Sequence, residues 1–237
     1  MNIRHAVLTD SGPRAVNEDA ADCWRSGSTT IACVADGLGG MGGGDVASQL
    51  AMRTFRASLD NTPPLEESLL DAAWEAHRAI RAAQLSGDGT TRMATTLTAI
   101  AITYGKLIGV HCGDSRAAIA RGKGIKKLTV DHSEGQRLFE AGKLTKEELL
   151  NYQRKHILES ALGEKGEPRI DKFSFDLSPG DRLFLTTDGV HNIVLLRELQ
   201  RLASASNDPN DLVESVADTV QERGPTDNYS IVALYVD

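Results

Sequence analysis

Residues 95–129 read TTLTAIAITYGKLIGVHCGDSRAAIARGKGIKKLT, and the pattern of this segment indicates the fold class. It contains four short runs rich in Ile, Val, Thr and Ala, separated by the turn sequences Tyr104-Gly105-Lys106, Gly113-Asp114-Ser115 and Gly122-Lys123-Gly124. Short turns that contain glycine are typical of antiparallel hairpins. We therefore predict a four-stranded antiparallel meander. A doubly wound parallel sheet is excluded because its strands alternate with helices.

The rest of the chain also groups its strands together and its helices in pairs. Further apolar runs of strand length lie at residues 30–35, 172–177, 182–186 and 229–236. Helical spacing of apolar residues occurs in two pairs of segments, residues 45–59 with 65–85 and residues 195–203 with 211–223. We predict an α+β fold, a four-layer α-β-β-α sandwich of two antiparallel sheets flanked by helix pairs. Residues 131–166 are polar and helix-prone, which predicts an excursion over one edge of a sheet.

The composition limits the classes of function. A chain of 237 residues can bury a full core, and it has no linker or repeat, so we predict a single domain over residues 1–237. The 26 Lys and Arg against 33 Asp and Glu give a net charge of −7, which argues against nucleic acid as a partner. No apolar run has the length of a signal peptide or a membrane span, so we expect a cytoplasmic protein without a membrane partner. Cys23, Cys33 and Cys112 have no C-x-x-C spacing, which favours buried thiols.

Residues 34–44, VADGLGGMGGG, raise the question of a nucleotide site. Gly37, Gly39 and Gly42 match the dinucleotide-binding pattern G-x-G-x-x-G, between a predicted strand and a predicted helix. Asp36 does not fit that function, because its charge would face a pyrophosphate with no positive group in the loop to offset it. The segment also lacks the Lys-Ser or Lys-Thr pair of a P-loop. Binding of a dinucleotide cofactor is therefore the weaker interpretation of this glycine-rich segment.

Acidic residues at the ends of predicted strands support a different function for this loop. They are Glu18, Asp19, Asp36, Asp114, Asp188 and Asp227, and glycine follows both Asp36 and Asp188. Carboxylates at strand ends converge on the rim of a sheet, where like charges cannot all stay ionised without cations. Hard divalent metals bind such oxygen clusters, and glycine lets a backbone carbonyl approach the same ion. The sequence therefore predicts a metal site whose rim the glycine loop shapes.

Six motifs carry a resemblance to a known family. They are, in chain order, Arg14-x-x-Asn17-Glu18-Asp19, Val34-Ala35-Asp36-Gly37-Leu38-Gly39-Gly40, Gly113-Asp114-Ser115-Arg116, Leu128-Thr129-Val130-Asp131-His132-Ser133, Thr187-Asp188-Gly189 and Thr226-Asp227-Asn228. Together they resemble the metal-dependent protein phosphatases, the type 2C serine/threonine phosphatases, in their compact bacterial form. The motifs run from residue 14 to residue 228, which is nearly the whole chain. The spacings that a cysteine nucleophile, an aspartyl-phosphate enzyme or a serine hydrolase require are absent.

The resemblance implies two Mn²⁺ or Mg²⁺ ions with a bridging water, and it implies how the chain would hold them. Asp36 is expected to bridge both metals, and Gly37 is expected to offer its carbonyl oxygen. Asp188 and Asp227 are expected to ligate one metal. Asp19 is expected in the shell around that metal, in part through water.

Further positions match the family pattern around that centre. Glu18 is expected to reach the other ion through water, and Asp114 matches the position that in bacterial members helps to hold a third, weaker metal. Arg14 matches the arginine that grips the substrate phosphate, a task suited to the paired hydrogen bonds of a guanidinium. Arg14 and Asp36 are thus the expected catalytic residues. Residues 131–166 match the flap that borders the active site.

The chain differs from part of the family at the position of the acid that protonates the leaving group. Many animal members carry a histidine directly after the metal-binding Asp-Gly, and here that position is Leu38. A metal-bound water is the first candidate for this task, and His132 and His156 are further candidates.

The implied function is metal-dependent hydrolysis of phosphoserine and phosphothreonine in proteins. This reaction reverses the phosphorylation carried out by a Ser/Thr kinase. The expected partners are phosphorylated proteins, a cognate Ser/Thr kinase and its targets, and we expect a bacterial monomer. One alternative is a non-catalytic module of the same fold that binds a phosphoprotein. Another is a phosphatase restricted to one phosphoserine regulator. Loss of Asp36, Asp188 or Asp227 would indicate the non-catalytic module, and all three are present.

Overall fold

The computed structural model describes residues 1–39, 42–59, 66–86, 92–155 and 157–237. The strands are β1 (Ile3–Asp10), β2 (Asp19–Ser26), β3 (Thr29–Leu38), β4 (Ala94–Thr95), β5 (Leu97–Thr103), β6 (Lys106–Cys112), β7 (Arg116–Arg121), β8 (Gly124–Lys127), β9 (Asp171–Asp176), β10 (Arg182–Thr186) and β11 (Tyr229–Val236). The helices are α1 (Gly44–Leu59), α2 (Glu66–Leu85), α3 (Glu134–Glu140), α4 (Lys146–Asn151), α5 (Asp188–His191), α6 (Leu196–Ala205) and α7 (Pro209–Glu222).

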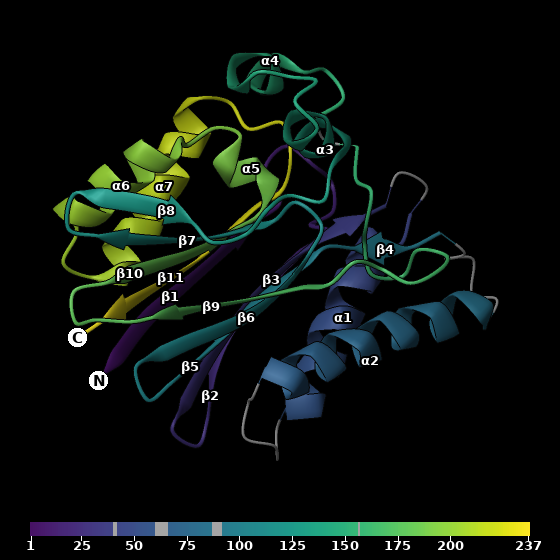
Figure 1. Cartoon of the computed structure of the whole chain (residues 1–237), viewed down its shortest axis with the longest axis horizontal. Helices are drawn as coiled ribbons and strands as arrows, with labels where there is room; N and C mark the ends of the chain where they lie inside the picture. The colour runs from purple at the N-terminus through teal and green to yellow at the C-terminus, as the bar shows by residue number, and fades with distance from the viewer. Residues whose placement is uncertain (40–41, 60–65, 87–91, 156) are drawn as a thin grey trace.

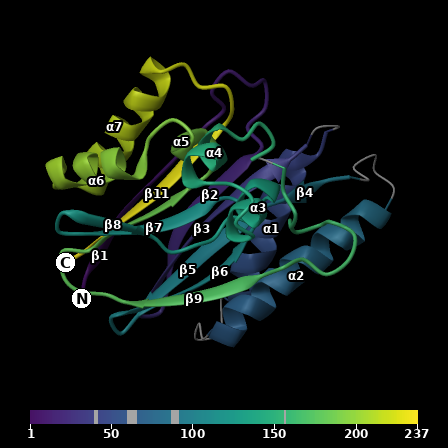
Figure 2. The same ribbon diagram turned by 45° about the horizontal axis from the view of Figure 1, so that its top comes forward.

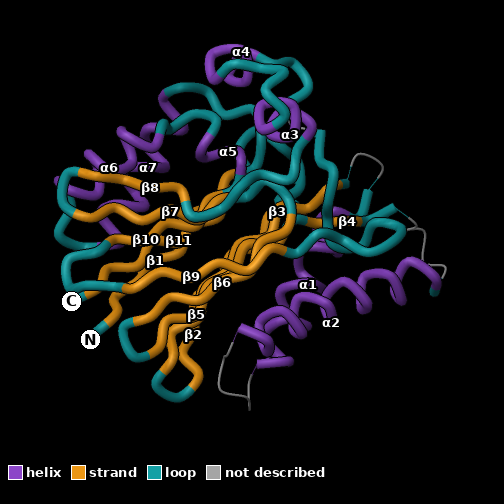
Figure 3. The backbone as a smooth tube through the Cα atoms, viewed as in Figure 1, coloured by secondary structure: helices purple, strands orange, loops and turns teal. Residues whose placement is uncertain are grey.

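Two antiparallel sheets form the centre of the molecule (Figure 1). One has the strand order β1-β11-β10-β7-β8, and the other has the order β2-β3-β5-β6-β9, with β4 paired to β3. Helices α1 and α2 cover one outer side and α6 and α7 cover the other, as Figures 2 and 3 show. The predicted four-layer α+β sandwich is therefore confirmed. The antiparallel pairing of β3 with both neighbours also excludes a βαβ nucleotide-binding unit at the glycine loop.

The central strands are buried on both faces, because each sheet lies between the other sheet and a helix pair. Along β3, Ile31 belongs to the same core cluster as Phe55 of α1. Val34 instead belongs to the cluster between the sheets, with Leu185 and Val232. Successive side chains of a strand point to opposite faces, so a strand buried on both sides has a continuous apolar run. Burying each large apolar side chain contributes about 1.5–3 kcal/mol to folding.

Residues 95–129 form two hairpins in different sheets, so the prediction of one meander was wrong. β5 pairs with β6 in one sheet, and β7 pairs with β8 in the other. The chain crosses between the sheets at Gly113, whose φ of +106° favours glycine. A Cβ at this position would also lie 2.5 Å from Cγ2 of Thr96. The edge of β6 that β7 would have occupied pairs with β9.

Some elements were not predicted from the apolar pattern. The sequence of β1, IRHAVLTD, and that of β2, DAADCWRS, are rich in charged or small residues. β1 nevertheless pairs along its whole length with β11, so the two ends of the chain lie side by side (Figure 1). The helix predicted over residues 65–85 is α2, and residue 65 lies outside the described residues.

Residues 131–166 contain the helices α3 and α4, which lie apart from both helix pairs at the top of Figure 1. Helix α4 begins with a capping box, in which Thr145 and Glu148 each accept a hydrogen bond from the backbone of the other. None of the residues of α4 is buried. Local hydrogen bonds therefore hold α4 more than core packing does.

The antiparallel pairing brings strand ends from both sheets together. Asp19 at the start of β2 lies opposite Asp36 near the end of β3. In the other sheet, the N–H of Thr187, just after β10, donates to the carbonyl of Ser230 in β11 at 3.1 Å. Residues after β10 therefore lie next to residues at the start of β11. The acidic residues of the sequence motifs occupy these ends.

Candidate metal centre

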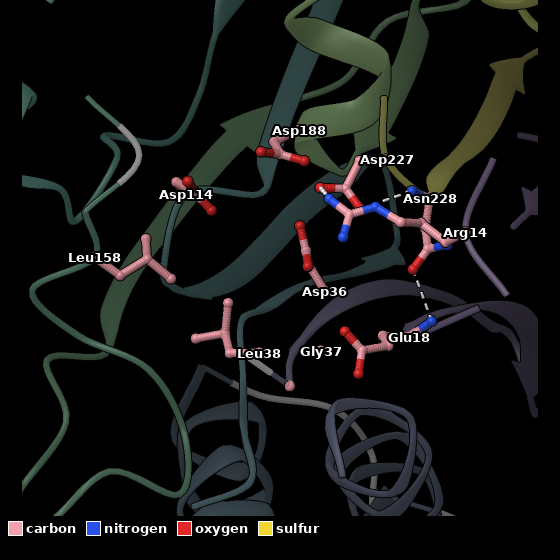
Figure 4. Close-up of a pocket in the computed structure, with 11 residues that line it drawn as sticks. Arg14, Glu18, Asp36, Gly37, Leu38, Asp114, Leu158, Asp188, Asp227 and Asn228 are labelled. Carbon is pink, nitrogen blue, oxygen red and sulfur yellow. Dashed lines mark hydrogen bonds and ion pairs between the residues drawn. The ribbon is translucent and has the colours of Figure 1, made fainter. Parts of the chain in front are cut away.

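A polar pocket of about 300 Å³ opens where these strand ends meet. It is lined by Arg14, Glu18, Asp36, Gly37, Leu38, Gly39, Asp114, Leu158, Asp188, Asp227 and Asn228. Seven of the eight residues that the sequence predicts for the site are in this lining, and the eighth, Asp19, is buried next to Asp36. Figure 4 shows the side chains of Asp36, Asp188 and Asp227 around one shared space.

The end of β3 fixes Asp36 in this pocket. The backbone N–H of Asp36 donates to Oγ1 of Thr96, and its carbonyl accepts from the N–H of Thr96, both at 2.9 Å. Gly37 is required by close packing, since a Cβ there would lie 2.2 Å from the backbone oxygen of Gly44. This glycine therefore allows tight backbone packing beside a carboxylate. Residues 40–41 of the same loop lie outside the described residues.

Asp19 joins the two sheets next to the pocket. Its Oδ2 accepts from Oγ1 of Thr187 at 2.8 Å and from Oγ of Ser230 at 2.7 Å. Burial raises the pKa of Asp19 to about 6, although these two hydrogen bonds act in the opposite direction. Asp19 belongs to β2, whereas Thr187 directly follows β10 and Ser230 belongs to β11. The carboxylate is therefore held firmly at the interface of the sheets.

The carboxylates of the pocket repel one another. Burial raises the pKa of Asp36 well above its usual value, and the charges of Asp19 and Asp188 raise it further. Burial raises the pKa of Asp114 to about 7, with the charge of Asp188 as the next cause. Such a cluster needs protons or cations to offset its charge. The pocket therefore favours bound cations at neutral pH.

The donor set fits hard divalent cations. The described residues that line the pocket include five carboxylates and one guanidinium, and they include neither His nor Cys. Mg²⁺, Mn²⁺ and Ca²⁺ prefer such oxygen ligands, whereas structural zinc sites use Cys and His. In the described part of the chain, no three acidic, His or Cys side chains already have the arrangement of a metal site. The pocket is thus an open set of donors and not a closed coordination shell.

Arg14 supplies the positive charge at the rim of the pocket. Its guanidinium donates to Oδ2 of Asp227 at 2.9 Å and to the carbonyl of Thr226 at 3.0 Å. The Arg14 side chain is 56% exposed, so water screens the ion pair, which contributes at most about 1 kcal/mol. The guanidinium can therefore leave Asp227 at a small energetic cost and turn to an anion in the pocket.

Asn228 is a site residue to which the sequence motif alone assigned no function. Its Oδ1 accepts from the backbone N–H of Glu18 at 2.8 Å. Its Nδ2 donates to the carbonyls of Ser11 and Val16 at 2.8 and 3.0 Å. The amide thus fixes the loop that carries Arg14 and Glu18, and a carboxylate could not donate the two hydrogen bonds. The available signal was its position directly after Asp227.

His132 lies outside the pocket lining and supports the turn at residues 113–115. Its Nδ1 accepts from the N–H of Gly113 at 3.3 Å, and its Nε2 lies 3.2 Å from Oδ2 of Asp171. Because Nδ1 accepts, the proton of the neutral ring is on Nε2. Burial lowers the pKa of His132, and only 1% of its side chain is exposed. His132 is therefore a structural residue, and His156, the other candidate acid, lies outside the described residues.

The same residues fall within a match to a known family. The family model of protein phosphatase 2C matches residues 13–228. The chain is 31% identical to the protein phosphatase PhpP of Streptococcus pneumoniae, over 97% of this chain and 96% of that protein. It is similar to the crystal structure of the Mycobacterium tuberculosis serine/threonine phosphatase PstP/Ppp, with a TM-score of 0.89, 28% identity and 99% of both chains covered. A structure of the PstP catalytic domain with two manganese ions gives a TM-score of 0.85 and 30% identity, with 99% of both chains covered. The chain therefore belongs to the protein phosphatase 2C family.

Proposed function

We propose that this chain hydrolyses phosphoserine and phosphothreonine in proteins, with two Mn²⁺ or Mg²⁺ ions held in the pocket. The chain is a protein serine/threonine phosphatase, as its family and its relatives indicate. The observation that carries the site proposal is the cluster of mutually repelling carboxylates beside one arginine. Relatives such as PhpP are named as phosphatases, which favours catalysis over a non-catalytic phosphoprotein-binding module.

Asp36 is proposed to bridge the two ions, and Gly37 is proposed to offer its carbonyl oxygen as a further ligand. The side chain of Asp36 points into the space beside Asp188 and Asp227, which supports this role (Figure 4). Asp188 and Asp227 are proposed to hold one of the ions. Asp19, oriented by two hydroxyl groups, is proposed to act in the shell around that ion.

Glu18 and Asp114 are proposed to contribute to the outer part of the metal centre, on opposite sides of it. Glu18 would reach the second ion through water, and Asp114 would help to hold a third, weaker ion. Both carboxylates line the pocket, and both have raised pKa values because of burial. A bound cation would offset the energetic cost of ionising these buried carboxylates at neutral pH.

Catalysis needs a nucleophile and a means to hold the phosphate. Two bound divalent ions would lower the pKa of a water molecule and stabilise charge on the entering and leaving oxygens of an in-line displacement. Arg14 is proposed to exchange Asp227 for two phosphate oxygens, because its paired N–H groups match them. The described lining includes no Ser, Cys or His that could attack phosphorus, which supports direct attack by water.

The wider biological setting is proposed as well. We propose that residues 1–237 act as one catalytic domain with residues 131–166 as its flap, since Leu158 from that region lines the pocket. A bacterial, cytoplasmic monomer that opposes a cognate Ser/Thr kinase and acts on its targets is the proposed context. The net charge of −7 supports the absence of a nucleic acid partner. No helix within the described ranges combines the length and the apolar character needed to cross a membrane.

The test is phosphate release from a phosphothreonine peptide by the purified chain, with Mn²⁺ and with excess EDTA. Asp36→Asn, which keeps the side-chain shape and removes the charge, is the matched control. We expect release only with Mn²⁺, and a loss of at least about 10³-fold in kcat for the variant, as for other essential site groups. Release in EDTA at the rate seen with Mn²⁺ would contradict the metal mechanism. No release with metal demonstrably bound would favour the binding module.

A further inference from the structure

A second cavity of about 570 Å³ adjoins the metal pocket and shares Asp114 and Asp188 with it. One wall consists of residues of α3, α4 and the segment that follows them, and the opposite wall consists of residues of α5 and the start of α6. Residues of β7 and β8 form the floor. Clefts that bind small ligands have volumes of about 300–1000 Å³. The cavity is therefore large enough for a short peptide segment beside the phosphate site.

Large apolar side chains line this cavity from both walls. Leu149 and Leu150 belong to α4, Leu196 is the first residue of α6, and Leu195 directly precedes it. Leu150 is 61% exposed and Leu195 is 64% exposed, whereas leucines such as Leu97 and Leu185 are buried in the cores of the sandwich. Exposed leucines on opposite walls favour contact with an apolar side chain of a bound partner.

The same cavity carries positive charges that have no acidic partner. Lys146 and Lys155 lie on the wall formed by α4 and the following segment, and Arg197 lies on the opposite wall. Among the described residues, none of these three side chains forms an ion pair, and Nζ of Lys155 donates to the carbonyl of Leu150. The chain as a whole has a net charge of −7. Three uncompensated cations in one cavity are therefore a local exception.

The cations on the floor of the cavity are held in ion pairs. Arg116 and Lys127 both pair with Asp131, at 2.6 and 3.0 Å. Asp114 and Asp188 lie at the end shared with the metal pocket, where the proposed ions would offset their charge. The part of the cavity away from the metal pocket is thus apolar and positive.

We propose that this cavity binds the segment of the substrate protein next to the phosphorylated residue, and that it selects a segment with acidic side chains and one large apolar side chain. The proposal rests on the proposed function, because a phosphate in the first pocket brings its flanking residues to the shared boundary at Asp114 and Asp188. An extended chain spans about 3.3 Å per residue, so only the nearest few residues would reach the cavity. Opposite charge and apolar contact together define this substrate class.

The test compares two phosphothreonine peptides that differ only in their flanking residues. One carries Glu and Leu, and the other carries Gln and Ala at the same positions. The test variant combines Lys146→Glu with Arg197→Glu. The control for charge reversal is Lys123→Glu, in the turn between β7 and β8 and outside the cavity lining. The small ester p-nitrophenyl phosphate reports on the metal pocket alone.

We expect a kcat/KM about fivefold to tenfold higher for the acidic peptide, since each exposed charge pair contributes little. The preference should disappear in the double variant, remain in Lys123→Glu and decrease with added salt. Hydrolysis of p-nitrophenyl phosphate should be the same in all three proteins. In EDTA, where no turnover occurs, fluorescence anisotropy should show that the labelled acidic peptide binds more tightly than the labelled neutral one.

Contrary results would separate this proposal from the function on which it rests. Equal kcat/KM for the two peptides, with p-nitrophenyl phosphate still hydrolysed, would overturn the cavity proposal and leave the phosphatase intact. Equal losses on peptide and on p-nitrophenyl phosphate in the double variant would also overturn it. No hydrolysis of any substrate with Mn²⁺ would overturn the proposed function. The ratio of the two peptide affinities, measured by anisotropy, would then test the cavity proposal by itself. A dimer that the double variant abolishes would identify a second copy of the chain as the occupant instead.

Discussion

Replacing Asp114 by asparagine should stabilise the metal-free protein above neutral pH. Burial raises the pKa of Asp114 from 3.8 to about 7. At about 1.4 kcal/mol per pH unit, this difference destabilises the folded state by about 4 kcal/mol once the group is ionised. The side chain is partly exposed to the pocket, so water screens its charge and we expect about half of that value, ~2 kcal/mol. Asparagine keeps the shape and removes the charge.

The pH dependence of this effect has a definite sign. A raised folded-state pKa means that the folded protein holds its proton to higher pH than the unfolded chain does. The cost in wild type is therefore absent below about pH 4, grows up to about pH 7 and is constant above it. The advantage of Asp114→Asn should follow the same curve.

Thermal unfolding in EDTA, followed by circular dichroism at pH 4.5 and at pH 8, measures this advantage. A gain of ~2 kcal/mol corresponds to a Tm increase of about 4–8 °C for a chain of this size, and we expect it at pH 8. Asp218→Asn changes an exposed carboxylate on α7 and is the control. An Asp114→Asn protein that melts at or below the wild-type temperature at pH 8 would refute the argument, as would an advantage that does not shrink at pH 4.5.

Further substitutions test the other parts of the site. Asp36→Ala and Asp188→Ala should lower kcat by at least about 10³-fold while the metal-free fold persists, because removing an anion relieves repulsion; steady-state kinetics and circular dichroism measure both effects. Arg14→Ala should raise KM for a phosphopeptide more than it lowers kcat, since the arginine holds phosphate in ground and transition states alike. Gly189→Ala should destabilise the fold by about 3 kcal/mol in thermal melts, because its Cβ would lie 1.9 Å from the carbonyl oxygen of Asn228.

Each of these expectations can fail on its own. Unfolded metal-free forms of both aspartate variants would show that the anions support the fold instead of straining it. An unchanged KM would remove Arg14 from phosphate binding. A Gly189→Ala protein as stable as wild type would show that the backbone after β10 adjusts freely.

The layers of the fold could be predicted because burial leaves a readable pattern. The apolar runs of β3, β10 and β11 reflect strands covered on both faces, and helical spacing marked α1, α2, α6 and α7. β1 and β2 were missed because many of their side chains are charged or small, and cross-strand pairing decides their structure. The switch between sheets at Gly113 depends on tertiary packing against Thr96, which local sequence does not encode.

The site could be predicted where its carboxylates come at or directly after the ends of predicted strands. Asp36 and Asp188 stand directly before glycines at strand ends, and this position brought them into one interpretation. Asn228 acts through contacts with a loop more than 200 residues away in the sequence, so its position directly after Asp227 does not reveal its role. The second cavity arises from two walls that meet only in the fold, α4 and the start of α6. Its selectivity could therefore not be inferred from motifs.

The acidic pocket is proposed to bind two divalent ions, and hydrolysis is proposed to depend on them. The most direct measurement titrates Mn²⁺ into the metal-free chain and follows bound metal and phosphate release from a phosphothreonine peptide together. We predict that release begins only as the chain takes up metal, reaches its maximum at two tightly bound ions per chain, and is absent in Asp36→Asn. Full release at less than one bound ion per chain, or an Asp36→Asn protein with wild-type uptake and turnover, would contradict hydrolysis by two bound ions.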